Sequence, residues 1–271
     1  MDAKPPRGRA RVRSARDTRR GEVALAEPAR GKGAAAESKP AQPTPFSFLR
    51  YASVAAALIV GGALCYGGTA QFVAGLLQAR ADGSLQAIDW DQDNVSAALI
   101  ARATDQLADA DHWWPASINT YNRGAAETQL AMQSETAAAA RPLLDAAMRD
   151  LKLSIEQNPT NAASWAWLSY VLFTEQGGSP ATINALSMSI ELARFDPTLL
   201  ALRCEIGLFI YPALDDQHRA TLNDQIRLLG RHSIRELVDV ARLTHSLNIV
   251  IAALLAGDNQ TIIRFMDLLQ S

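Results

Sequence analysis

The chain contains little that points to a chemical reaction. It has only two cysteines, Cys65 inside an apolar run and Cys204 far along the chain, so a disulfide framework is excluded. No Cys/His spacing suits zinc, and both a glycine-rich phosphate loop and a Gly-x-Ser-x-Gly nucleophile motif are missing. The sequence therefore predicts no metal and no cofactor, and it indicates no catalytic residue.

Large apolar residues are almost missing from residues 1–46, which are rich in Arg, Ala and Pro. Such a composition buries too little surface to offset chain entropy, so we expect a disordered tail. Residues 1–50 hold twelve Lys/Arg against five Asp/Glu, whereas residues 51–271 hold fourteen against twenty-three. A basic tail can bind nucleic acid or anionic lipid headgroups. We favour a topological role in the cytoplasm, with no nucleic-acid partner.

Charge is absent from residues 51–79, between Arg50 and Arg80. Because about twenty apolar residues cross a bilayer as a helix, residues 47–80 are predicted to be a transmembrane helix. The run is longer than the apolar core of a signal peptide, which favours an uncleaved single-pass anchor. The positive-inside rule then predicts a cytoplasmic amino terminus and an exported domain, residues 81–271. In a bacterium this places the anchor in the inner membrane and the domain in the periplasm.

After the anchor, apolar residues recur at three and four positions, which predicts an all-α domain. The expected helices are Val95–Ala110, Ala137–Gln157, Ala162–Thr174, Pro180–Arg194, Thr198–Tyr211, Asp215–Leu229, Ser233–Thr244, Leu247–Leu255 and Asn259–Leu269.

Internal similarity suggests a repeat. The segments AIDWDQDN (87–94), SIEQNPTN (154–161) and SIELARFDPT (189–198) each look like a helix end followed by a new helix start. Around the middle copy, the spacing of large and small residues follows the tetratricopeptide pattern: Ala147, Leu151, Ser154, Pro159, Trp165, Leu168, Ser169 and Leu172. Ile206-Gly207 repeats the large-small pair. We therefore expect tetratricopeptide (TPR)-like hairpins stacked as in an α-solenoid.

A more specific resemblance follows from NPTNAASWAWLSYVLF and FDPTLLALRCEIGLFIYPALDDQHRATLNDQIRLL, with their Leu-Arg…Gly…Leu-Asp…His-Arg run. Over roughly residues 85–245 the chain resembles the VpsP-like accessory proteins of exopolysaccharide biosynthesis operons. The resemblance implies a protein partner in polysaccharide assembly, and it carries over no catalytic residue.

Acidic residues between Asp89 and Asp111 offer two candidate sites. Asp89, Asp91 and Asp93 begin like a calcium loop, but Asn94 and Ile100 stand where such a loop needs Gly and Glu. Helix capping explains these acids more simply.

The other candidate is the stretch Asp109, Asp111, His112, Trp113 and Trp114, which could form a sugar site with a carboxylate pair. A helix end followed by an aromatic loop explains the same residues.

A partner-binding surface is the remaining candidate. In the TPR arrangement the first helix of each hairpin lines the concave face, where Ala166, Tyr170 and Phe173 would lie, while Trp165 fills the core. Packing against the next hairpin is the alternative. We expect a non-enzymatic scaffold in exopolysaccharide or envelope assembly. Alternatives are a periplasmic peptide-binding or chaperone-like receptor and, third, a glycan-acting enzyme.

Overall fold

The structure is a computed structural model that describes residues 45–86, 97–257 and 259–270. Residues 1–44 of the predicted disordered tail and the acidic segment from Asp89 to Asn94 lie outside these residues, whereas Pro45 and Phe46, also assigned to the tail, begin the first helix. Within them every regular element is helical, which confirms the all-α prediction. By contacts the chain divides into Met1–Val54 and Ala55–Ser271. The second unit therefore contains most of the first helix as well as all later ones.

Helix α1 (Pro45–Gln86) is long and apolar enough, over Leu49–Gly83, to cross a membrane. The large apolar side chains in its first part are exposed on all sides: Leu49, Tyr51, Val54, Leu58, Ile59, Val60, Leu64 and Tyr66. Further along the helix, Phe72 and Leu76 are exposed as well. Water does not favour a helix that exposes apolar side chains all round. Of the described helices, α1 is the one with this property.

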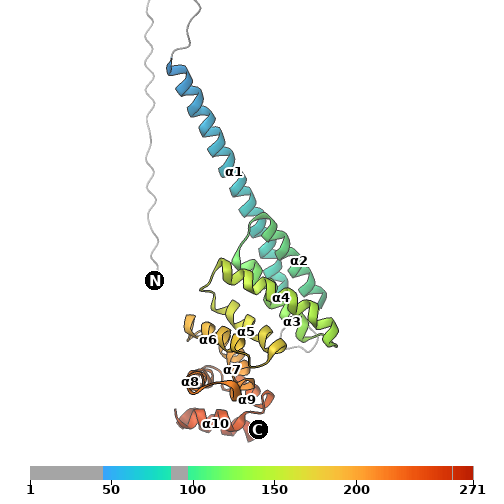
Figure 1. The fold of residues 1–271 in the computed structure, drawn as a ribbon, viewed down its shortest axis with the longest axis vertical. Helices are drawn as coiled ribbons and strands as arrows, with labels where there is room; N and C mark the ends of the chain where they lie inside the picture. The colour runs from blue at the N-terminus through green and yellow to red at the C-terminus, as the bar shows by residue number, and fades with distance from the viewer. Residues whose placement is uncertain (1–44, 87–96, 258, 271) are drawn as a thin grey trace, which may run out of the picture. The chain divides into compact units, whose positions relative to one another are not determined.

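One face of the carboxyl-terminal part of α1 is buried. Ala70 and Ala74 are buried, and Ala81 packs with Ala103 and Leu107 of α2 (Ala97–Trp113). Helix α2 runs back along this part of α1 (Figure 1). One continuous helix therefore has an exposed apolar half and a half that belongs to the helical domain.

Beyond α2 the helices pack in consecutive pairs. These are α3 (Ser117–Met132) with α4 (Ala137–Gln157), α5 (Ala162–Gln176) with α6 (Pro180–Leu192), and α7 (Leu200–Phe209) with α8 (Asp216–His232). The first helices also meet, α3 with α5 and α5 with α7. Short 3-10 turns, Pro197–Leu199 and Tyr211–Ala213, flank α7, and α9 (Ile234–Leu243), α10 (Leu247–Leu255) and α11 (Asn259–Gln270) complete the domain (Figure 1).

Small residues allow the two helices of a pair to approach closely. A Cβ on Gly124 of α3 would stand 2.7 Å from Leu151 Cγ of α4, and one on Gly207 of α7 would stand 2.5 Å from Leu222 Cδ1 of α8. Ser169, at the corresponding place in α5, is fully buried. The large-small pattern in the sequence therefore marks real helix contacts, whereas membership of the TPR family stays a prediction.

Side-chain caps set the helix boundaries that the sequence indicated. Asn161 caps α5 by accepting from the N–H groups of Ala163 and Ser164, and Asp196 accepts from Thr198 N–H. Both caps lie in the segments read as a helix end followed by a helix start. Helices α4 and α10 have the predicted bounds.

Helix α3 was not predicted at all. Its buried face carries small and polar residues where apolar ones would normally recur: Asn119, Thr120, Gly124, Ala126, Thr128 and Ala131. The apolar period used to recognise helices is therefore weak in this segment.

A buried arginine closes the end of α6. Arg203 is fully buried and donates from Nε to Ser189 Oγ (2.9 Å), from one NH group to Ser189 O (2.6 Å) and from the other to Ala193 O (2.8 Å). Each of these carbonyls also accepts one backbone N–H, from Ala193 and Asp196 respectively, so Arg203 adds charged donors to groups at the end of the helix. Burial lowers the pKa of Arg203 to about 10, so the guanidinium remains charged at neutral pH.

We predict that Arg203→Met lowers the free energy of unfolding by about 3 kcal/mol, because two buried carbonyls lose charged donors. Arg194 is a matched control: it is half-exposed and pairs with Asp224 at the surface, so Arg194→Met should cost less than about 1 kcal/mol. Denaturant unfolding of the full chain in detergent, followed by circular dichroism, measures both. Equal losses would contradict the role given to Arg203.

Candidate interaction surface

The structure separates the three predicted surface residues. Ala166 is 0% exposed and packs with Ala162 and with Leu199, which lies just before α7. It therefore has no surface to offer a partner. The helical period correctly puts Ala166 near the face of α5 that carries Tyr170 and Phe173, but the following hairpin covers that part of the helix.

Tyr170 and Phe173 are half-buried and belong to a larger group of aromatic side chains. Phe173 stacks on Phe209 with ring centroids 5.3 Å apart, and Trp167 meets Tyr170 edge-on at 6.3 Å. Tyr121 and Trp167 pack against the same cluster of buried residues. We call this group the aromatic row: Tyr121, Trp167, Tyr170, Phe173 and Phe209.

The aromatic row crosses three consecutive first helices, α3, α5 and α7. Its most accessible member is Phe209, which is 39% exposed. Sequence reasoning missed Tyr121 because it missed α3. It also missed Phe209, although the match of Ile206-Gly207 with Leu168-Ser169, carried two residues onward, places Phe209 in register with Val171, next to Tyr170.

Burial controls the charges near the aromatic row. It raises the pKa of Tyr170 to about 12, with a further contribution from the carboxylate of Glu205, and burial also raises the pKa of Glu205. Burial raises the pKa of Tyr121 as well. At neutral pH the row therefore presents neutral rings and phenols beside one acidic group.

Trp165 does not lie deep in the core. It is half-buried against a cluster of buried residues from α4 and α5 that includes Leu151 and Leu168. Its indole N–H donates to Pro159 O at 2.9 Å. The ring thus ties the start of α5 to the turn before it.

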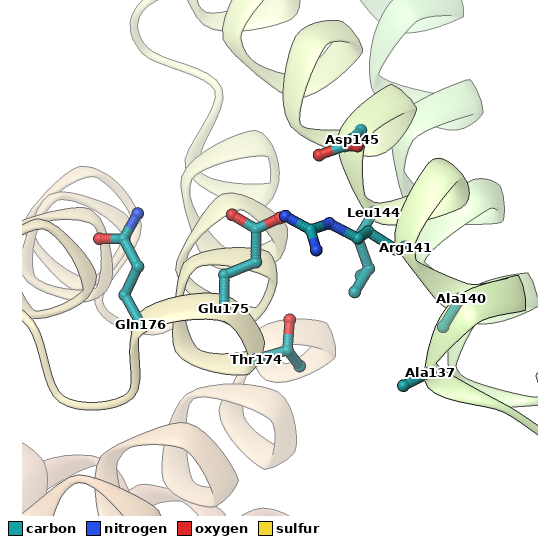
Figure 2. Close-up of a pocket in the computed structure, with 8 residues that line it drawn as sticks. All are labelled: Ala137, Ala140, Arg141, Leu144, Asp145, Thr174, Glu175 and Gln176. Carbon is teal, nitrogen blue, oxygen red and sulfur yellow. The ribbon is translucent and has the colours of Figure 1, made fainter.

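Pockets lie between α4 and α5 and between α6 and α8. One of about 500 Å³ lies between the first half of α4 and the end of α5. It is lined by Arg141, Asp145 and Glu175, and Figure 2 shows Arg141 and Glu175 pointing toward each other. Two smaller ones, of about 430 and 420 Å³, lie between α6 and α8 and share Glu191.

The Asp/Trp stretch forms a structured turn. Asp111 Oδ1 accepts from Ala116 N–H at 3.0 Å, while Asp109 and His112 are exposed. The carboxylate of Asp111 is therefore occupied in holding the α2–α3 turn. Among the described residues no group of three or more His, Cys, Asp or Glu converges on a possible metal position.

Remaining reactive groups have local roles. His218 contacts the carboxylate of Asp215, the residue that caps α8. Cys204 is fully buried, which raises the pKa of its thiol, whereas Cys65 is exposed on α1.

A charged cluster lies between α3 and α4. Arg123 donates to both oxygens of Asp150, at 2.7 and 2.5 Å. Glu127, one turn along α3, has a buried Oε2 without a hydrogen-bond partner. Burial, together with the negative charge of Asp150, raises the pKa of Glu127 to about 7, although Arg123 and Arg149 oppose the shift.

Comparisons of the chain with protein-family models, with curated proteins and with solved structures return no match.

Glu127 should make stability depend on pH. Its carboxyl binds its proton more tightly in the folded state, so the folded protein loses stability as pH rises from about 4.5 to about 7. We expect Glu127→Gln to be more stable than wild type by about 2 kcal/mol at pH 8, and equally stable near pH 4. Urea midpoints across this range test the prediction.

Glu156→Gln, at an exposed position of α4, is the matched control and should keep the pH dependence of wild type. A constant difference between wild type and Glu127→Gln at all pH values would contradict the assignment.

Proposed function

We propose that this chain is a membrane-anchored interaction protein that uses the aromatic row to hold a protein partner in envelope or exopolysaccharide assembly. The observation that carries the proposal is the aromatic row itself, which crosses three successive hairpins and keeps Phe209 accessible. Aromatic side chains supply much of the binding energy at protein interfaces. Successive hairpins present such side chains on one extended surface.

Anchoring is supported by the exposed half of α1. The stretch Leu49–Thr69 rises about 31 Å at 1.5 Å per residue, close to the thickness of a bilayer core. Its backbone groups are paired within the helix, as a membrane span requires. The basic amino-terminal region and the acidic later region support a cytoplasmic tail and a periplasmic domain in a bacterial inner membrane.

Topology fusions test this orientation. A reporter that is active only outside the cytoplasm should be active when fused after Ser271 and inactive when fused before Asp2, because the positive charges precede α1. A cytoplasmic reporter at the same two positions is the control and should give the inverse pattern. Activity of the export reporter at the amino terminus alone would overturn the orientation.

The choice of pathway rests on the resemblance to VpsP-like accessory proteins. Neighbouring genes for glycosyltransferases and a chain-length regulator would support it. A periplasmic peptide receptor is the second candidate, and the α4–α5 pocket favours it, because Arg141 and Glu175 offer both charges to the ends of a peptide.

Photocrosslinking in cells tests the partner surface. We predict that a photoreactive phenylalanine analogue at Tyr170 or Phe209 gives a discrete crosslinked product, since both positions lie on the aromatic row. Leu153 is a matched control: it is 38% exposed but lies on α4, a second helix. The same product from Leu153, or none from Tyr170 and Phe209, would argue against the surface.

The acidic residues distinguish a scaffold from an enzyme. Asp89, Asp91, Asp93, Asp109 and Asp111, each changed to Asn, should retain pathway function in cells; Asp111→Asn should cost only about 1 kcal/mol of stability. Deleting residues 154–211 should abolish function. A stable Asn variant that makes no product would favour the enzyme, because loss of an acid/base catalyst costs roughly 10²–10⁴-fold in rate.

A further inference from the structure

Two tryptophans at the turn between α2 and α3 are exposed to solvent. Trp113 is 46% exposed and Trp114 is 43% exposed, and Ile118 in the first turn of α3 is 41% exposed. None of them belongs to the aromatic row, and none lines the α4–α5 pocket or the two α6–α8 pockets.

Helix geometry gives the position of the turn along α1. Ala81 packs with Ala103 and Leu107, and α2 runs back along α1 from there (Figure 1). From Leu107 to Trp113 α2 advances six residues, about 9 Å, and the same distance back along α1 from Ala81 reaches the neighbourhood of Ala74. Burial of α1 begins on one face here, since Ala70 and Ala74 are its first buried residues, while Phe72 and Leu76 stay exposed.

The turn is held rigidly. Asp111 Oδ1 accepts from Ala116 N–H, and Trp114 N–H donates to Ala110 O, both at 3.0 Å. The indole rings are therefore presented outward by a fixed backbone. Ordering them against another surface costs little backbone entropy.

The surface that fits is a lipid one. If Leu49–Thr69 fills the bilayer core, the level of Ala70–Ala74 coincides with the lipid headgroups. Tryptophan prefers this depth, because its ring is apolar and its N–H needs a polar partner. Asp109 is exposed nearby, and its negative charge opposes attraction to anionic lipids, so the aromatic rings supply the contact.

We propose that the α2–α3 turn rests on the periplasmic membrane interface, with Trp113 and Trp114 inserted among lipid headgroups beside the point where α1 leaves the bilayer. This contact rests on the proposed anchoring. It gives the helical domain a second point of attachment to the membrane.

Lipid-borne quenchers test the proposal on the full chain in phosphatidylcholine nanodiscs. In a Trp90→Phe background, lipids with a nitroxide near the headgroup should quench tryptophan emission, and Trp113→Phe/Trp114→Phe should remove most of that quenching. The control Trp165→Phe/Trp167→Phe removes the two tryptophans of α5. It should leave the quenched fraction of the tryptophan emission unchanged or raise it.

A fluorophore on Cys65 separates this proposal from the anchoring. Cys65 is exposed on α1 whereas Cys204 is buried, so a thiol reagent labels the anchor selectively. Quenching of the Cys65 label and of Trp113 and Trp114 together is the expected result. A quenched Cys65 label with tryptophans accessible only to a water-borne quencher would overturn the interfacial contact and leave anchoring intact. An unquenched Cys65 label would overturn both.

Discussion

The first two hairpins each depend on a fully buried serine in the last turn of their second helix. Ser154, in the last turn of α4, donates to Ser117 O at the start of α3 and bonds Ser164 at the start of α5. Ser189, in the last turn of α6, donates to Ala162 O at the start of α5 and accepts from Arg203 of α7. One hydroxyl therefore joins three helices, and it does so twice. Because both hydroxyls are fully buried and an unpaired buried hydroxyl is costly, these bonds fix how one hairpin follows the next.

Close approach within a hairpin depends on small residues. Two helices of a pair can meet along their length only where one of the facing residues is small. Gly124 against Leu151 and Gly207 against Leu222 fulfil this condition. Larger side chains are displaced to the outer faces of the first helices, which explains why Trp167, Tyr170 and Phe209 gather on one surface.

Local signals were readable from the sequence, and contacts between hairpins were not. Asn161 and Asp196 cap helices through their own neighbours, so their roles follow from short motifs. Helix α3 was not predicted because its buried face carries small and polar residues. The burial of Ala166 was not predicted because it depends on Leu199, which belongs to the next hairpin. Helical periodicity predicts the direction of a side chain, but it does not predict what lies in front of it.

The continuity of α1 has a mechanical consequence. Flexible linkers allow a tethered domain to sample many positions, whereas α1 passes without a break from its exposed apolar stretch into contact with α2 through Ala81. Asn122 of α3 adds a weak hydrogen bond to Asp82 at 3.5 Å. The helices that follow are therefore joined to the exposed stretch of α1 by packing as well as by the chain. If that stretch spans a membrane, as proposed, a partner bound to the aromatic row is held at a restricted distance from the bilayer, which suits assembly with other membrane-bound components better than capture of freely diffusing ones.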